Sequence, residues 1–150
     1  MSMNLKHELQ SALTTAMKAR DEDTKRVLRL VMSAIKLAEV DKRGEIDDAT
    51  IMSLLQKEIK TRNEMIEEAK RANRHDLVEI AERESAILNR FLPQQMDSGE
   101  LETLVKDVIS ELGATNIQDM GQVMKTLMPR IAGRASGKDA SNLVKNLLNN

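Results

Sequence analysis

Apolar residues recur at helical spacing through most of the chain. In the first run, Leu5, Leu9 and Leu13 follow one another at intervals of four residues, with charged and polar residues between them. This spacing places the apolar side chains on one face of an amphipathic helix. Four stripes of this kind fill the N-terminal part of the chain, at residues 5–17, 27–38, 51–69 and 77–91.

Capping and helix-breaking residues separate these stripes. Asp47 or Asp48 is predicted to cap the third helix, because a carboxylate before a helix accepts hydrogen bonds from its first free amides. Asn73 or Asp76 marks the start of the fourth helix or a kink into it, and Pro93 ends it. The pattern therefore predicts about four helices before Pro93.

A break at residues 92–99 divides the chain. It combines Pro93 with polar turn formers and with Ser98, which we expect to cap the next helix. Beyond it, Gly113 and Pro129 are predicted to end the first two of three shorter helices. The three apolar patterns lie at residues 101–112, 117–128 and 139–148.

Together these patterns predict an all-α protein. We expect an N-terminal helical domain of about four helices at residues 1–93 and a small three-helix tail domain at residues 97–150. The chain of 150 residues is long enough for one small domain or two very small ones. Its 41% hydrophobic and 31% charged residues are typical of a folded, water-exposed protein.

Composition excludes several kinds of chemistry. The chain has no cysteine, so it forms no disulfide, thiolate nucleophile or cysteine zinc site. Its nine serines include no G-x-S-x-G turn, and His7 and His75 lie far apart without metal-ligand spacing. We therefore expect no catalytic residue, no metal and no cofactor.

The first residues and the absence of cysteine also bear on location. The chain reaches a charged residue at Lys6 without an apolar stretch, which predicts no signal peptide. No run approaches the roughly 18 apolar residues that a membrane span needs. We expect a cytoplasmic protein with no membrane partner.

One glycine-containing segment resembles a phosphate-binding loop only in part. Gly133 and Gly137 are separated by three residues rather than four, and Asp139 stands where a P-loop has serine or threonine. An ATP site is therefore not expected. Two interpretations stay open: the glycines let backbone amides and nearby cations approach a phosphate of a larger ligand, or they only turn the chain between two helices.

Charge is uneven although the net charge is only −1. From residue 120 to the C-terminus there is one acid, Asp139, and a local excess of four positive charges. Its five basic residues are Lys125, Arg130, Arg134, Lys138 and Lys145. A second basic group, Lys25, Arg26, Arg29 and Lys36, falls on the second predicted helix. Four cations alone do not define a partner.

Three methionines form a further pattern. Met120, Met124 and Met128 recur every four residues and would make a stripe on the middle helix of the tail. Such a stripe fills a small core or forms an adaptable surface for a protein partner. The second interpretation keeps open a helical protein-protein adaptor.

Segments in both parts of the chain resemble one known protein family. The run from Asp119 to Lys145, with its spacing of glycine, methionine, glycine, alanine and the Gly137-Lys138 pair, resembles the C-terminal tail of the GatB/YqeY family. The first domain is similar to the same family, and the match runs over nearly the whole chain and is of the free-standing YqeY type. Its matching segments are Arg26–Leu30, Lys57–Arg62, Arg74–Leu77 and Phe91–Gln95.

The resemblance implies a function. In that family the module ends the B subunit of the glutamine-dependent amidotransferase for Glu-tRNA(Gln) and Asp-tRNA(Asn), a carbon-nitrogen ligase. There it is implied to hold the tRNA while the chemistry takes place elsewhere. By this resemblance the chain is a tRNA-binding accessory module of translation and not an enzyme on its own. The alternative is a helical adaptor that docks on an amidotransferase or another enzyme without binding RNA.

The basic tail and the single aromatic residue, Phe91, fit such a module. A protein without aromatic platforms recognises RNA by shape and phosphate position, and folded tRNA suits this mode better than unstacked bases. We expect the five basic tail residues to contact phosphates and no DNA to bind. Because few counterions would be released, we expect weak, salt-sensitive affinity.

Overall fold

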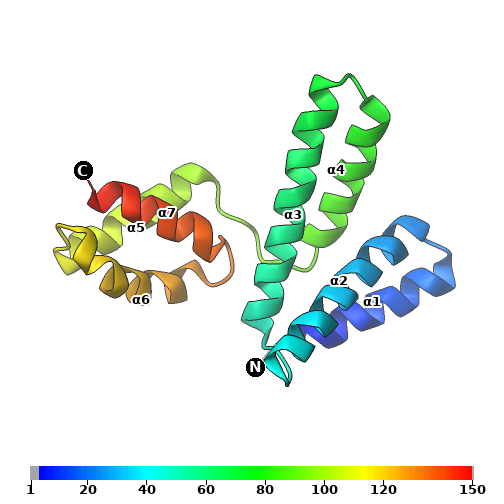
Figure 1. Cartoon of the computed structure of the whole chain (residues 1–150), viewed down its shortest axis with the longest axis horizontal. Coiled ribbons are helices and arrows are strands. Elements are labelled where there is room, and N and C mark those ends of the chain that lie inside the picture. The colour runs from blue at the N-terminus through cyan, green and yellow to red at the C-terminus, as the bar shows by residue number, and fades with distance from the viewer. Residues whose placement is uncertain (1–3, 150) are drawn as a thin grey trace. The chain divides into compact units, whose positions relative to one another are not determined.

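The computed structural model describes residues 4–149, and every regular element within them is helical (Figure 1). The all-α prediction is therefore confirmed. The elements are α1 (Leu5–Ala19), α2 (Glu22–Lys42), α3 (Asp48–Arg71), α4 (His75–Asn89), α5 (Ser98–Leu112), a short 3-10 helix η1 (Ile117–Asp119), α6 (Met120–Ile131) and α7 (Gly137–Leu148).

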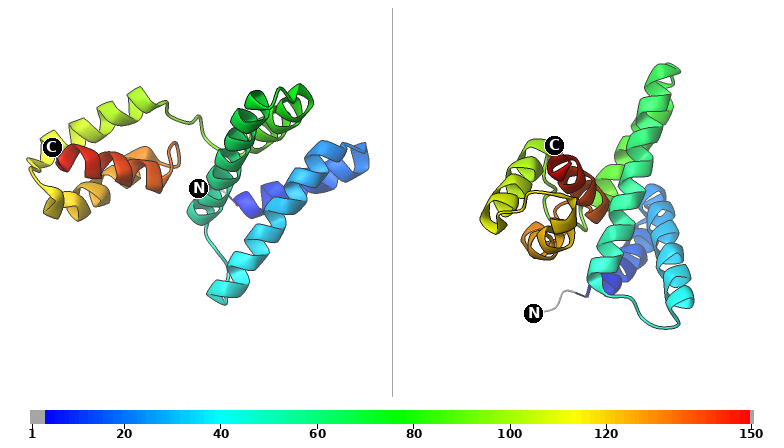
Figure 2. Two further views of the ribbon diagram at one scale, coloured as in Figure 1. Left: turned by 45° about the horizontal axis from the view of Figure 1, so that its top comes forward. Right: turned by 60° about the vertical axis from the view of Figure 1, so that its left-hand side comes forward.

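The helices form two compact units, Met1–Pro93 with α1 to α4 and Gln94–Asn150 with α5 to α7. In the first unit, α1 and α2 lie side by side as one pair, and α3 and α4 as another (Figure 2). In the second unit the three shorter helices all pack on one another. Each unit encloses its own apolar core.

Aliphatic side chains fill the core of the first unit. Leu5, Leu28, Ile35, Leu55 and Leu88 are each fully buried, and together they come from all four helices. A smaller cluster, Ile66, Ala69, Val78 and Ala81, joins the distal parts of α3 and α4. The four stripes read from the sequence are thus the faces that meet here, apart from boundary differences of a few residues.

The two adjacent aspartates at the start of α3 have different hydrogen-bond donors. Asp47 is the N-cap: its carboxylate accepts hydrogen bonds from the Thr50 amide at 2.9 Å and from the Thr50 hydroxyl at 2.6 Å. Asp48 instead accepts a hydrogen bond from the Leu5 amide at 3.1 Å and so ties the start of α1 to the start of α3. Sequence alone left this choice open, because both residues are good caps.

Two charged side chains are buried where α2, α3 and α4 meet. Arg62 and Glu84 are only 6% and 8% exposed, and the Arg62 Nε atom lies 3.8 Å from Glu84 Oε1. Arg26 Nη2 of α2 lies 3.6 Å from the other Glu84 oxygen, and Glu58 accepts a 2.7 Å hydrogen bond from Arg62. One glutamate thus faces cations from two other helices.

Two predicted boundaries in the second unit were wrong. Pro129 does not end its helix: it lacks the amide hydrogen that would bond the Lys125 carbonyl, yet α6 continues two residues further to Ile131, which is fully buried in the core. Ser98 is the first residue of α5, while Asp97 is the N-cap and accepts a 2.8 Å hydrogen bond from the Glu100 amide.

The position of Glu84 generates a stability prediction. Replacing Glu84 with alanine leaves the buried Arg62 with fewer counter-charges, so the free energy of unfolding should fall by about 2 kcal/mol. Urea denaturation followed by circular dichroism measures it. The exposed neighbour Glu82→Ala is the matched control and should change stability by less than about 0.5 kcal/mol. Equal effects of the two substitutions would contradict the assignment.

Candidate nucleic-acid interface

Acidic and basic residues of the second unit lie in different parts of its sequence. Residues 94–119, which include α5, contain six acidic residues and one basic residue, Lys106. Residues 120–149, which include α6 and α7, contain five basic residues and one acidic residue, Asp139. All five predicted RNA-binding residues therefore lie on α6, on α7 or in the loop between them.

Two of these five cations are used inside the unit. Arg130 forms a two-bond ion pair with Glu111 of α5, at 3.0 and 2.6 Å. Arg134 forms an ion pair with Glu100 at 2.7 Å and donates a hydrogen bond from Nε to the Gln94 carbonyl at 2.8 Å. Both arginines thus tie the basic part of the unit to its acidic part.

The loop between α6 and α7 makes further internal contacts. The Met96 amide donates to the Arg134 carbonyl at 2.7 Å, and the Gln95 side chain donates to the Gly133 carbonyl at 3.0 Å. Residues 94–96 are therefore part of the second unit. These bonds support the interpretation in which Gly133 and its neighbours turn and anchor the chain.

The two glycines of the predicted phosphate loop differ in conformation. Gly133 has a φ of 80°, which side-chain-bearing residues rarely adopt, and it follows Ala132 at a φ of 50°. Gly137 is the first residue of α7, and a Cβ there would meet only the Met128 side chain at an ordinary 3.7 Å. The backbone thus favours glycine at 133, whereas α7 has no such need of it at 137.

The three lysines are placed differently from the arginines. Lys125, Lys138 and Lys145 are exposed, and none of them forms an ion pair within residues 4–149. Lys138 and Lys145 are seven residues apart on α7, so they lie on the same side of this helix at about 10 Å along its axis. These two lysines are brought together by the structure.

Two asparagines extend this surface and were missed by the sequence analysis. Asn142 and Asn149 are exposed and stand four residues after Lys138 and Lys145. The spacing i, i+4, i+7 puts Lys138, Asn142 and Lys145 on one face of α7, and Asn149, the C-cap residue directly after the helix, follows at i+11. We call this set, Lys138, Asn142, Lys145 and Asn149, the α7 polar face. The signal that could have found it was the helical spacing of amide side chains between the lysines.

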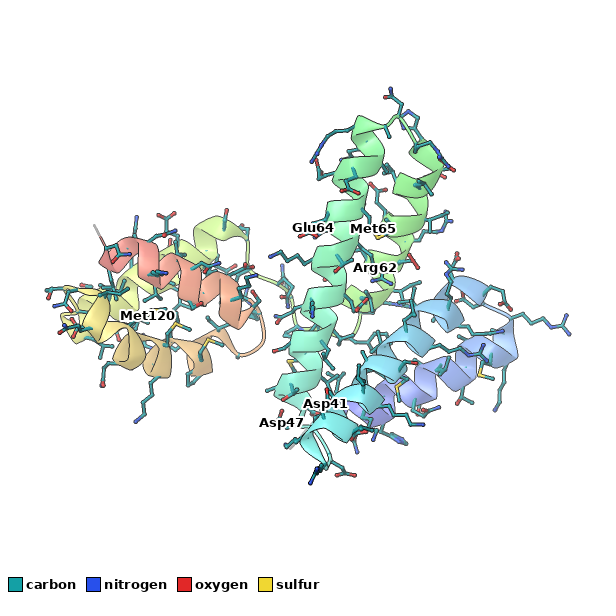
Figure 3. The ribbon with its side chains drawn as sticks, viewed as in Figure 1. Asp41, Asp47, Arg62, Glu64, Met65 and Met120 are labelled. Atoms are coloured by element: carbon teal, nitrogen blue, oxygen red, sulfur yellow. The ribbon has the colours of Figure 1, made fainter. Side chains whose placement is uncertain are left out.

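The methionine stripe is largely used by the core. The buried residues of α6 are Val123, Leu127 and Ile131. Met120 and Met124 pack against that core, whereas Met128 is 36% exposed. Figure 3 shows Met120 on the second unit. An adaptor surface built from this stripe would therefore have only one exposed methionine.

The described residues offer few other kinds of site. Among residues 4–149, no group of three or more His, Asp or Glu side chains has an arrangement that could hold a metal ion. None of the described helices combines the length and apolar character that crossing a membrane requires. What the fold and the α7 polar face define is a helical protein with a polar, positively charged surface on a small three-helix unit.

Comparison with known proteins gives the family. Residues 6–148 match the model of the Yqey-like protein family, so the chain belongs to this family. The resemblance predicted from the sequence is therefore confirmed.

Curated relatives are fungal. The chain is 34% identical over 116 residues to "Altered inheritance of mitochondria protein 41, mitochondrial" of Lachancea thermotolerans, covering 75% of this chain and 60% of the relative. It is 30% identical over 134 residues to the protein of that name in Pyrenophora tritici-repentis, covering 85% and 71%. The chain thus spans less than two thirds of the Lachancea relative.

The ion pair between α5 and α6 predicts a pH effect. Hydrogen bonds from Arg130 hold the pKa of the Glu111 carboxyl below its ordinary value. Because the folded-state pKa is lowered, the pair stabilises the fold above the ordinary carboxyl pKa, and this contribution is lost as the pH falls through the folded-state value. In an NMR titration, Arg130→Gln should raise the pKa of Glu111. An unchanged pKa would contradict the pair.

The two glycines predict opposite effects of the same substitution. Gly133→Ala forces a side chain into the left-handed region and should lower the free energy of unfolding by about 1 kcal/mol. Gly137→Ala should leave it unchanged or raise it by up to about 1 kcal/mol, since alanine is the better helix former. Thermal or urea unfolding of both variants measures this difference. A larger loss at 137 than at 133 would contradict the assigned roles.

Proposed function

We propose that the second unit binds folded tRNA and that the chain acts as a tRNA-holding accessory module. The observation that carries the proposal is the α7 polar face, with Lys138 and Lys145 exposed and outside any ion pair among the described residues. Lysine ammonium groups and asparagine amides are common donors to phosphate and sugar oxygens. The family's relation to the end of an amidotransferase subunit supports the same partner.

The separation of basic and acidic residues within the second unit determines which part of it would face the RNA. Phosphates are attracted to the basic side of α6 and α7 and repelled by the acidic residues that α5 contributes. Lys125 on α6 adds a third exposed cation. The proposal gives Lys125, Lys138 and Lys145 the main phosphate contacts. Arg130 and Arg134 contribute to the electrostatic field and hold the unit together.

The lack of aromatic residues in the second unit indicates which kind of RNA it would bind. Phe91 is its single aromatic residue and belongs to the first unit, so the second unit has no ring on which an unpaired base could stack. Contacts would go to the phosphates and sugars of a folded RNA, with little reading of base sequence. Discrimination among tRNAs would then depend on their shape.

Catalysis is not part of the proposal. The module would hold tRNA for an amidotransferase or a similar enzyme that supplies the chemistry. Two relatives are named as mitochondrial proteins, whereas the sequence of this chain predicted a cytoplasmic one. A tRNA-holding role fits both locations, because translation takes place in each.

The lysines of α7 provide the direct test. Lys138→Ala with Lys145→Ala removes two phosphate contacts, so tRNA affinity should fall about tenfold at low salt. The slope of log affinity against log salt should become shallower by about 1.5. Fluorescence titration of labelled tRNA at several salt concentrations measures both. The matched control, Lys57→Ala with Lys60→Ala, removes the same charge from α3 of the first unit and should have little effect.

A substitution at Asn142 distinguishes direct contact with RNA from general electrostatic attraction. Asn142→Ala should weaken binding by a few-fold and leave the salt slope unchanged, because an amide releases no counterion. Arg134→Ala is unsuitable for this purpose, because its contacts with Gln94 and Glu100 stabilise the unit itself. Loss of binding in the α3 control equal to that in the α7 double variant would refute the proposed surface.

A further inference from the structure

A narrow apolar seam runs along the outer face of α2. Leu30, Leu37 and Val40 are 53%, 63% and 64% exposed, which is unusual for three large aliphatic side chains on one helix. With the exposed Ser33 they occupy positions i, i+3, i+7 and i+10. This is the a and d spacing at which one helix packs along another. We call these four residues the α2 seam.

The seam plays no part in the core of its own unit. The buried face of α2 is formed by Val27, Leu28, Val31 and Ile35, which turn toward the other helices. On a helix of 3.6 residues per turn, the a and d positions of the seam lie on the side away from this face. Nothing in the fold of the first unit therefore accounts for leucine at positions 30 and 37.

Cations line one edge of the seam. Arg29 and Lys36 directly precede the two leucines, at the g positions that flank a helix-packing stripe. Neither forms an ion pair within the described part of the chain, whereas Lys25 and Arg26 pair with Glu22 and Asp23 one turn away. A shallow hollow of about 430 Å³, lined in part by Arg29, Leu30 and Ser33, lies at one end of the seam.

We propose that the α2 seam docks an acidic amphipathic helix of a protein partner. Leu30 and Leu37 at the a positions and Val40 at a d position favour apolar side chains on the partner helix. Arg29 and Lys36 favour glutamate or aspartate facing them. The seam spans Leu30 to Val40, about 15 Å or three helical turns. So short a contact buries little area, so the affinity should be micromolar or weaker.

The pattern favours this occupant over an RNA or a lipid surface. Contacts to RNA phosphates need the cations but not the three exposed aliphatic side chains beside them. Helices that lie in a membrane interface present a broad apolar face, usually with aromatic residues, whereas the α2 seam is one stripe with a serine in it. A second helix satisfies both the stripe and its charged edge.

The test uses the full chain and a synthetic helix as probe. The probe is a peptide of about 21 residues with leucine at a and d and glutamate at e and g, which keeps it from pairing with itself. We expect saturable binding by fluorescence anisotropy. The double variant Leu30→Glu with Leu37→Glu should weaken it at least tenfold. The matched control, Met17→Glu with Leu112→Glu, alters two exposed apolar residues elsewhere and should leave it unchanged.

Charge reversal supplies a second, gain-of-function arm. Arg29→Glu with Lys36→Glu should lose the glutamate peptide and gain affinity for the same peptide with lysine at e and g. A peptide of identical composition with its leucines out of register should bind weakly to every variant. Circular dichroism confirms that each variant is folded.

Three results would overturn the proposal. One is no binding of the glutamate peptide at millimolar concentration. Another is equal binding of the peptide with scrambled leucines, which would indicate charge attraction alone. The third is loss of affinity for tRNA or for anionic phosphatidylserine vesicles, rather than for the peptide, when Leu30 and Leu37 are replaced. This test is independent of the α7 lysines, so the two proposals can fail separately.

Discussion

The aliphatic core that joins α5, α6 and α7 holds the second unit together, and the exposed contacts of Arg134 and Arg130 fix how its basic part meets its acidic part. Arg134 joins Glu100 and the Gln94 carbonyl across about forty residues of sequence, and Arg130 grips Glu111 with two bonds. The planar guanidinium suits such fixed, two-pronged ties, whereas a lysine is a point charge on a flexible stem. The tail arginines make these internal ties, whereas Lys125, Lys138 and Lys145 are exposed and form no ion pair among residues 4–149, as the proposed RNA surface requires.

The first unit also uses ion pairs between helices, but there the central carboxylate is buried. There Glu84 is buried between Arg26 and Arg62, so ionic contacts supplement an aliphatic core that joins four helices. Figure 3 places Arg62 and Met65 on the side of α3 that faces α4 and Glu64 on the opposite side. The cations Arg29 and Lys36 have no such task and flank the α2 seam. The two proposals give RNA holding to the second unit and recruitment of a protein to the first.

The sequence predicts those features that depend on residues close together in the chain, and it does not predict contacts between residues far apart. Helical periodicity found every long helix, because the apolar stripes that define the helices are also the faces that bury them. The N-cap at Asp97 and the passage of α6 through Pro129 were missed, since they depend on a shift of one residue and on burial of Ile131. The roles of Arg130 and Arg134 could not be predicted either, because their partners Glu111 and Glu100 lie on another helix.

An amide-resolved NMR titration of the full chain with tRNA tests binding at the α7 polar face most directly. Binding there should place the largest shift changes or line broadening on residues 138, 142, 145 and 149 and on Lys125, and added salt should weaken them. Changes confined to α2 or α3, or no change on α7 while tRNA binds, would contradict it.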